Sequence, residues 1–149
     1  MKAIIQRVSS AKVKIRTECK AAIKKGLLLL LGIGNSDSEE DIQWLCKKIV
    51  DMRIFDDNEG IMNRSVKETA GEIIVVSQFT LMARTKKGNR PSYIDAAPPA
   101  ISRPLYESFI RQLSGEMGKE VQAGIFGADM QIELTNDGPV TIILDSKQR

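Results

Sequence analysis

The chain has 149 residues, of which 42% are hydrophobic and 28% are charged, and this length and balance favour a single domain, residues 1–149, with a buried core. Its formal net charge is +3, a weak indication of an anionic partner. The chain has no histidine, and Cys19 and Cys46 form no metal-binding motif, so a Ser-His-Asp triad, a Cys-His pair and the common zinc sites are excluded.

The first half of the chain predicts three strands followed by one helix. Residues 2–8 and 11–16 are expected to form two short strands, the second with one exposed face because apolar and basic side chains alternate. Residues 27–33 are apolar on both faces, which is typical of a strand buried in the middle of a sheet. Residues 35–55 predict a helix that is capped by serine or aspartate and has one apolar stripe.

The second half predicts a strand, a basic loop, a helix and two more strands. The strand covers residues 72–79, and the loop covers residues 82–92. A helix is expected to start near Ser102, after several prolines, and to end at Gly118. The two closing strands are expected at residues 130–134 and 140–145. This order predicts an α/β fold: a mixed β-sheet with two helices packed on its faces.

The segment between the closing strands reads Asn-Asp-Gly-Pro-Val-Thr, residues 136–141. Asn-Asp-Gly is enough to turn a chain, whereas a proline after it removes an N–H from the strand that it would open. The residues alone leave two interpretations open. Either the segment is a plain hairpin with a proline at a sheet edge, or the Gly138-Pro139 peptide has a function of its own.

Residues 77–81, Ser-Gln-Phe-Thr-Leu, end an apolar strand, and the strand ends of α/β sheets are common places for functional groups. The Thr80 hydroxyl has no neighbouring base to activate it as a nucleophile. The N–H groups of a chain that leaves its strand could instead bind a negatively charged oxygen. Composition and periodicity alone favour the simpler interpretation, in which Ser77 and Thr80 only satisfy hydrogen bonds at the strand end.

Basic residues stand out in two places. The loop after this segment carries Arg84, Lys86, Lys87 and Arg90 with no acid between them. This loop is either a solvated tip or a contact for the phosphate backbone of a nucleic acid, and the residues do not distinguish the two. Arg7 lies in an otherwise apolar strand, where its guanidinium either extends to solvent or holds a backbone carbonyl or a carboxylate.

Five segments together resemble one family, the D-aminoacyl-tRNA deacylases of the type common to bacteria and eukaryotes. They are Ser-Gln-Phe-Thr-Leu at 77–81, Lys-Lys-Gly-Asn-Arg-Pro-Ser at 86–92, Asp-Ala-Ala-Pro-Pro at 95–99, Phe-Gly-Ala-Asp-Met at 126–130 and Asn-Asp-Gly-Pro-Val-Thr at 136–141. Each is weak alone, but five in this order over essentially the whole chain are specific. The chain departs from the family pattern at Met82 and Arg84, where an aromatic residue and an acid are more common.

The resemblance implies which residues form the site. The backbone N–H groups of Phe79 and Thr80 are expected to bind the carbonyl oxygen of an ester while the ribose 2′-OH of the substrate assists, and Thr80 as a covalent nucleophile is the alternative. A cis Gly138-Pro139 peptide, held by Arg7, is expected to enter the partner subunit's site and to reject L residues. The catalytic residues implied are Ser77, Gln78, Phe79 and Thr80; the substrate-binding residues are Gly138, Pro139, Arg7 and Met130; the tRNA-binding residues are Arg84, Lys86, Lys87 and Arg90.

The function implied is hydrolysis of the ester bond of D-aminoacyl-tRNA, which releases free D-amino acid and tRNA. Glycine wrongly attached to alanine tRNA is expected to pass the same filter because glycine is achiral. The resemblance further implies a homodimer that needs no metal and no cofactor and does not have DNA as a partner. The unpatterned cysteines favour a reducing cytoplasm, and the lack of a run of about 18 apolar residues predicts no membrane span and no membrane partner. Two alternatives are an RNA-binding module without catalysis and a small α/β dimer in which Gly-Pro is only a turn.

Overall fold

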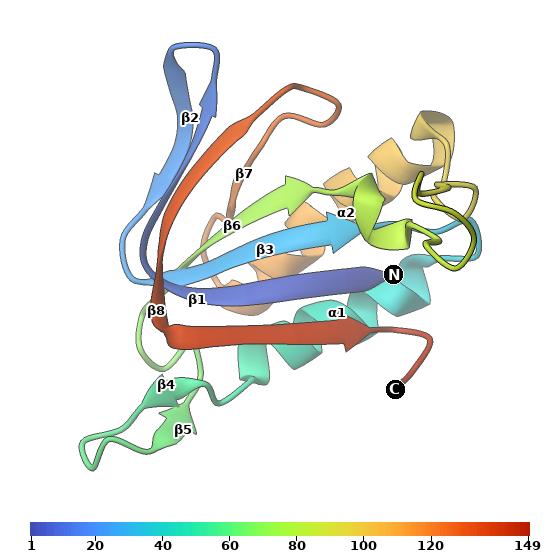
Figure 1. Ribbon diagram of the computed structural model, residues 1–149. Helices are drawn as coiled ribbons and strands as arrows, with labels where there is room; N and C mark the ends of the chain where they lie inside the picture. Colours follow the sequence, from blue (N-terminus) through green and yellow to red (C-terminus); the bar gives the residue numbers. More distant parts are fainter.

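A six-stranded sheet backed by two helices makes up the computed structural model, which describes residues 1–149 (Figure 1). In chain order the elements are β1 (Lys2–Ile15), β2 (Glu18–Ile23), β3 (Gly26–Gly32), α1 (Glu39–Asp51), β4 (Phe55–Asp56), β5 (Met62–Arg64), β6 (Glu72–Ser77), the 3-10 helix η1 (Phe79–Met82), α2 (Pro99–Met117), β7 (Gln122–Ala123) and β8 (Gln131–Asp145). The strand order is β2-β1-β3-β6-β7, with β8 also paired to β1, while β4 and β5 pair separately. Since β6 is parallel to β3 and β7 and the other pairs are antiparallel, the predicted mixed sheet is confirmed.

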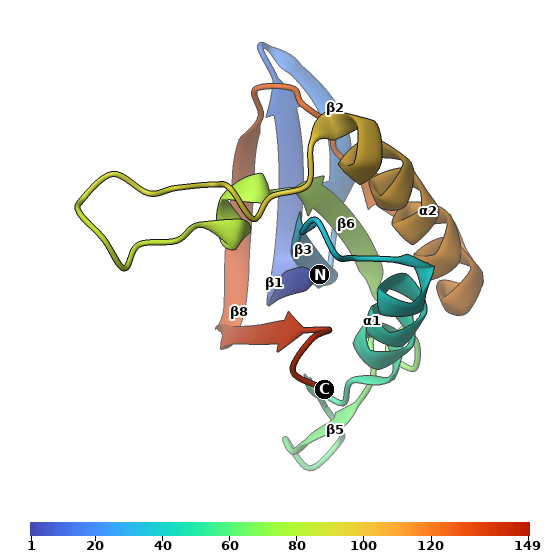
Figure 2. The same cartoon turned by 90° about the vertical axis from the view of Figure 1, so that its right-hand side faces the viewer.

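Both helices lie on the same face of this sheet (Figure 2). Leu45 and Ile49 of α1 share one buried cluster with Phe109 and Leu113 of α2 and with inward-facing residues of the strands. The expectation that helices cover both faces is therefore wrong. The strand order gives the reason. The connection from β3 to β6 contains α1, the connection from β6 to β7 contains α2, and both move to the next strand in the same direction across the sheet. Right-handed crossovers that move in the same direction place their helices on the same face.

The helix boundaries differ slightly from those expected. α1 covers Glu39–Asp51, with Ser38 as its N-cap, so it is shorter at both ends than residues 35–55. α2 begins at Pro99, earlier than expected, because proline suits the first turn of a helix, where its missing N–H would have no partner. It ends as expected at Gly118, whose φ of 69° is a left-handed conformation that glycine adopts readily.

Strands β1 and β8 are each longer than the sequence pattern predicted (Figure 1). The two expected opening strands form one continuous strand, and so do the two expected closing strands. β8 pairs with β1 on both sides of Gly138-Pro139, and the register shifts there between the pairs Asn136–Val8 and Thr141–Gln6. The hairpin interpretation of this segment is therefore wrong, because the extra residues are absorbed as an irregularity within one strand.

The face opposite the helices is covered only in part. The end of β1 (residues 10–15) bends over this face together with β2 and the start of β8 (residues 131–135) (Figure 1). These strands enclose a second, smaller cluster that includes Val8, Val13 and Ile74. Where this cover ends, the sheet stays open: Ile143 is 71% exposed, and Ile4 and Leu30 are half-buried. β2 itself escaped prediction because its sequence, Glu-Cys-Lys-Ala-Ala-Ile, has no regular alternation of β-branched residues.

Candidate functional site

A cavity of about 530 Å³ opens at the C-terminal end of β6, next to the start of α2 and the segment that leads into β8. Its volume is in the range of small-ligand sites, and such sites are mostly apolar with a few polar groups. Its wall is formed by Leu31, Ile33, Val76, Ser77, Gln78, Phe79, Ala96, Ala97, Pro99, Ser102, Phe126, Gly127, Ala128, Met130 and Ile132. Ten of these fifteen residues are hydrophobic, so the cavity matches that description.

Three of the five segments that carry the resemblance meet in this cavity. Residues 77–79 come from the end of β6, residues 96–99 from the approach to α2, and residues 126–130 from the connection between β7 and β8. The structure thus brings Ser77, Gln78, Phe79 and Met130 together in the wall of one cavity. Residue types alone assigned no role to the alanines at 96 and 97 or to Phe126, because small apolar side chains and a lone aromatic ring carry no distinctive chemical signature.

Two unpaired backbone groups lie where the chain leaves β6. The N–H of Gln78 donates to the carbonyl of Leu31 at 2.8 Å, whereas Phe79 and Thr80 are the first two residues of the 3-10 helix η1, where N–H groups have no partner within the helix. A backbone N–H is a strong donor that is rarely left without a partner. These two groups beside the cavity are therefore available to a polarised or negatively charged oxygen of a ligand.

The Thr80 side chain is engaged elsewhere. Its hydroxyl accepts a hydrogen bond from the side-chain amide of Gln78, with Nε2 and Oγ1 2.6 Å apart, and Thr80 is not part of the cavity wall. No carboxylate or amine contacts this hydroxyl, and the chain has no histidine. The arrangement therefore offers Thr80 no base that would activate it as a nucleophile.

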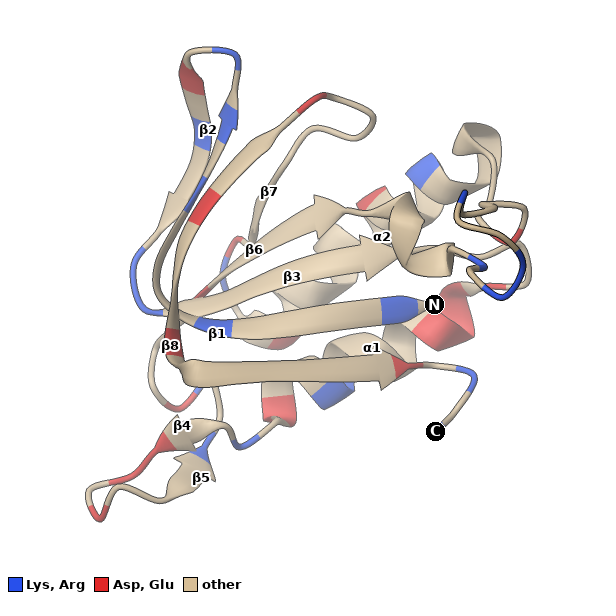
Figure 3. Ribbon diagram, in the orientation of Figure 1, with Lys and Arg blue, Asp and Glu red and all other residues tan.

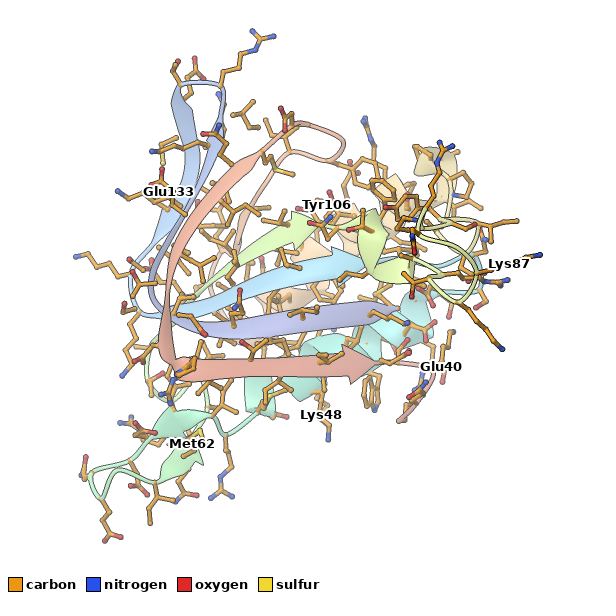
Figure 4. The ribbon with its side chains drawn as sticks, in the orientation of Figure 1. Glu40, Lys48, Met62, Lys87, Tyr106 and Glu133 are labelled. Atoms are coloured by element: carbon orange, nitrogen blue, oxygen red, sulfur yellow. The ribbon has the colours of Figure 1, made fainter.

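Tyr106 supports the cavity from behind. It projects from α2 toward the end of β6 (Figure 4), and its buried hydroxyl donates to the carbonyl of Val75 at 2.9 Å. Burial raises the pKa of Tyr106 above its usual value, so the phenol stays protonated over the working pH range. Its ring lies 5.7 Å from the ring of Phe126, which lines the cavity. Tyr106 thus ties α2 to the wall of the cavity.

Gly138 and Pro139 lie on the surface in the middle of β8 and are joined by a cis peptide bond. Gly138 has φ +124°, and a Cβ built there would lie 2.8 Å from Cγ2 of Val140 and 3.0 Å from Nη2 of Arg7. Neither residue lines the cavity. Because β1 and β3 separate β8 from β6, the two strands are three spacings, about 14 Å, apart. Within one subunit, therefore, Gly138-Pro139 does not reach Phe79.

Arg7 is buried and holds this segment. Its Nε donates to the carbonyl of Asp137 at 3.1 Å, and its Nη1 donates to the carbonyl of Ile54 at 2.7 Å and to Asp56 at 3.2 Å. Arg7 is only 6% exposed, so the alternative of an arginine extended to solvent is wrong. On the same side, Asn136 donates to the carbonyls of Arg7 and Val140 and so spans the segment.

The basic loop projects from the body of the protein on the side away from the helices (Figure 2), and its Lys and Arg positions are blue in Figure 3. Arg84 lies at its base, where it forms a two-point ion pair with Asp95 that raises the pKa of Arg84 and lowers the pKa of Asp95. Lys86, Lys87 and Arg90 form no ion pair, and Lys87 points outward (Figure 4). The four expected tRNA-binding residues thus divide into one paired and three free cations.

The acidic and sulfur-containing side chains are dispersed over the fold. No group of three or more cysteine, aspartate or glutamate side chains gathers closely enough to hold a metal ion. Both helices are amphipathic, and neither has the length and the apolar character together that crossing a membrane requires.

The chain matches known proteins over almost its whole length. A family model described as D-Tyr-tRNA(Tyr) deacylase matches residues 4–145. A protein named D-aminoacyl-tRNA deacylase from Bacteroides thetaiotaomicron is 61% identical over 149 residues, which is 100% of this chain and 99% of that relative. A relative of the same name from Flavobacterium psychrophilum is 62% identical over the same shares of the two chains.

Two solved structures are similar to the chain. One, described as c-Myc DNA Unwinding Element Binding Protein, is 39% identical with a TM-score of 0.90 and covers 97% of this chain and 98% of its own. The other, described as a probable eukaryotic D-amino acid tRNA deacylase, is 15% identical with a TM-score of 0.83 over 96% and 97% of the two chains, which shows a shared fold.

Proposed function

The chain belongs to the D-Tyr-tRNA(Tyr) deacylase family and is a D-aminoacyl-tRNA deacylase, and we propose that it hydrolyses the ester bond in the cavity beyond β6. The observation that supports this location for the reaction is that the N–H groups of Phe79 and Thr80, which have no partner within their helix, lie beside a mostly apolar cavity. The products are free D-amino acid and tRNA. The activity removes D residues from tRNA before they are used in translation.

Catalysis rests on backbone groups and on the substrate. The ester carbonyl accepts hydrogen bonds from the N–H groups of Phe79 and Thr80, which stabilise the negative charge that develops on its oxygen when water attacks. Ser77 and Gln78 set the position of these groups, since the N–H of Gln78 fixes the chain to Leu31. The ribose 2′-OH next to the ester orients the water or takes part in proton transfer. Met130 contributes an apolar wall.

This route explains how a chain without histidine can cleave an ester. An aminoacyl ester is already reactive, so stabilising the oxyanion and placing water lower the barrier without a strong base. A covalent route through Thr80 is disfavoured because its hydroxyl is bonded to the Gln78 amide and has no base beside it.

Selection against L residues is assigned to Gly138-Pro139 of a second subunit. In the proposed homodimer this segment enters the partner's cavity, where its carbonyls bind the α-amino group of the substrate and occupy the space that an L side chain would need. Three features support this arrangement: the segment is exposed, Arg7 holds it firmly, and its own subunit gives it no cavity. Glycine attached to alanine tRNA has no side chain to be rejected and is a second substrate.

The helix-free face of the sheet supplies the surface for this dimer. Ile143 is 71% exposed there and lies near the half-buried Ile4 and Leu30 on adjacent strands. Apolar residues that gather on one uncovered face are typical of an interface. A two-fold axis at this face would use the same patch on both subunits, and the proposal places it so that each cavity receives the other subunit's Gly138-Pro139.

The basic loop supplies affinity for the tRNA backbone. Lys86, Lys87 and Arg90 have no acidic partner, so their charges are free to contact phosphates, while Arg84 sets the base of the loop through Asp95. Activity in the cytoplasm is part of this proposal because charged tRNA is used there. The expectation that DNA is not a partner stays a prediction, and one similar structure is described as a DNA-binding protein.

The direct test is to incubate the purified protein with D-tyrosyl-tRNA and with L-tyrosyl-tRNA, with and without a chelator, and to follow loss of the ester. Loss of the D ester alone, at the same rate in chelator, is the expected result. Salt-sensitive binding of tRNA without loss of either ester would instead identify a binding module.

A further inference from the structure

Two aromatic rings are exposed at the mouth of the cavity. The chain has only seven aromatic residues, four phenylalanines, two tyrosines and one tryptophan, and Phe79 and Tyr93 are the two among them that are exposed, at 57% and 39%. Their ring centroids are 5.0 Å apart with an angle of 73° between the planes. An edge-to-face pair of this kind fixes the orientation of both rings, so one ring face is held ready for a third planar group.

The pair lies between the cavity and the basic loop. Phe79 lines the cavity, and the N–H of Ala96, which also lines it, bonds to the carbonyl of Tyr93 at 3.0 Å. On the other side, Ser92 pairs with Arg84 at the base of the loop that carries Lys86, Lys87 and Arg90. From the basic loop inward, therefore, the unpaired basic side chains come first, the two exposed rings next, and the proposed ester-binding cavity last.

This order matches a single strand of nucleic acid. The terminal adenosine carries the ester and so must lie in or directly at the cavity. The next nucleotide toward the tRNA body is the first whose base lies outside, and its phosphate is the first that the basic loop could meet. Proteins that hold single strands without sequence preference combine these two features, a basic surface for phosphates and aromatic faces for bases.

We propose that the Phe79–Tyr93 pair binds the base of the nucleotide that precedes the terminal adenosine of the substrate tRNA, with Tyr93 as the stacking ring. This inference rests on the proposed function and adds to it a contact outside the cavity. The contact strengthens binding of the ground state and the transition state alike, because the stacked base takes no part in the reaction. Without it, KM for tRNA rises and kcat is unchanged.

The test compares two substrates, D-tyrosyl-tRNA and 2′(3′)-O-(D-tyrosyl)adenosine, which ends at the nucleoside and lacks the stacked base. Four variants are used: Tyr93→Ala and Tyr93→Leu, which remove the ring, Tyr93→Trp, which keeps one, and Ile94→Ala. Ile94 is the matched control because it is the next residue and is 69% exposed. The dimer mass and melting temperature of each variant are measured alongside.

The expected result is that Tyr93→Ala and Tyr93→Leu raise KM for D-tyrosyl-tRNA about 10-fold, as removal of one base stack would. Both are expected to cleave the tyrosyl-adenosine as fast as wild type, and Tyr93→Trp and Ile94→Ala should match wild type on both substrates. Equal losses on the two substrates, a loss of the dimer, or no change on tRNA would each overturn the inference. If wild type cleaves neither substrate, the proposed function itself fails, and that outcome is distinct from the others.

Discussion

The cavity beyond β6 and the Gly138-Pro139 segment of β8 contrast in how each is built. The cavity is a hollow of about 530 Å³, and beside it the N–H groups of Phe79 and Thr80 open the helix η1 without a partner in that helix. The segment is exposed to solvent, and side chains behind it hold its backbone, with Arg7 bonded to the carbonyl of Asp137 and Asn136 bonded across it. The cavity offers backbone donors and an apolar wall, while the segment offers a backbone held by Arg7 but has no cavity of its own. The contrast is the reason for the proposal that two copies of the chain complete one site.

The largest effect is expected at Gly138. The change Gly138→Ala puts a methyl group 2.8 Å from Val140 and 3.0 Å from Arg7 at a residue with φ +124°, so the segment must shift. The rate on the D ester should fall because the acceptors for the α-amino group move, and the preference for the D over the L ester should fall at least about 100-fold. Rates on D- and L-tyrosyl-tRNA measure both.

Gly60→Ala is the matched control for this change. Gly60 also has a positive φ, +77°, but lies in the β4–β5 turn with nothing within 4 Å of an added Cβ. It is expected to lose some stability and no selectivity. If Gly138→Ala folds, dimerises and still refuses the L ester as wild type does, the role assigned to the segment is wrong.

Removal of the guanidinium that holds the segment is expected to have the next largest effect. Arg7→Met removes the donor to the buried carbonyl of Ile54 and to the part-buried carbonyl of Asp137, so the free energy of unfolding should fall by about 1–3 kcal/mol. The D-over-L preference should also fall, by about 10-fold, because the segment is no longer fixed. Urea unfolding and the two ester rates measure these effects.

Arg53→Met separates the two consequences of Arg7→Met. Arg53 also donates to a carbonyl, that of Asn63 at 2.9 Å, but on the exposed surface and without a bond to the segment. It should cost little stability and leave selectivity intact. An Arg7→Met protein with full selectivity would show that the segment does not depend on its anchor.

The basic loop is expected to matter for tRNA and not for the chemistry. The double change Lys86→Gln and Lys87→Gln should raise KM for D-tyrosyl-tRNA and reduce the slope of log affinity against log salt by about 0.7–0.9 for each phosphate that the loop no longer neutralises. The same change at Lys47 and Lys48, on the exposed side of α1, leaves net charge equal and is the control. Equal effects of the two double variants would mean that overall charge, and not this loop, guides tRNA.

The smallest effect is expected at Thr80. Because its hydroxyl bonds to Gln78 and does not face the cavity, Thr80→Val should keep the rate on the D ester within about 10-fold, the effect of removing about one hydrogen bond. Thr80→Ser should be closer still to wild type. A folded Thr80→Val protein with background activity beside a fully active Thr80→Ser would instead identify the hydroxyl as the nucleophile.

The central sheet could be predicted well from the sequence, and its closing strand could not. Residues 27–33 and 72–79 are uniformly apolar over most of their length, and they form the adjacent parallel strands β3 and β6, because burial on both faces leaves a clear pattern. The segment at 136–141 is expected from its sequence to separate two strands, because Asn-Asp-Gly has the composition of a turn. Its continuation as one strand depends on pairing with β1 on both sides, which no short-range signal reports.

The candidate site, too, could be predicted from the sequence only in part. Residues 77–80 could be placed at a strand end from periodicity, but only the structure shows that Phe79 and Thr80 open a 3-10 helix, where their N–H groups have no intrahelical partner. The positions of Ala96, Ala97 and Tyr93 follow from a loop whose course is set by distant contacts, such as the N–H of Ala97 bonded to the carbonyl of Ile33. Arg84 looked like its basic neighbours in sequence, and its ion pair with Asp95, eleven positions away, separates it from them.

The proposal that each site is shared between two subunits is tested most directly by combining two defective variants in one dimer. Ala128→Trp fills the cavity and leaves the Gly138 segment intact, whereas Gly138→Ala disturbs the segment and leaves the cavity intact. The two are co-expressed with different tags, the mixed dimer population is confirmed by mass spectrometry, and hydrolysis of D-tyrosyl-tRNA is measured. Random assortment makes half of the dimers mixed, each with one complete site, so about a quarter of wild-type activity should return. If mixed dimers form and activity stays at the level of the separate variants, the site is not shared between subunits.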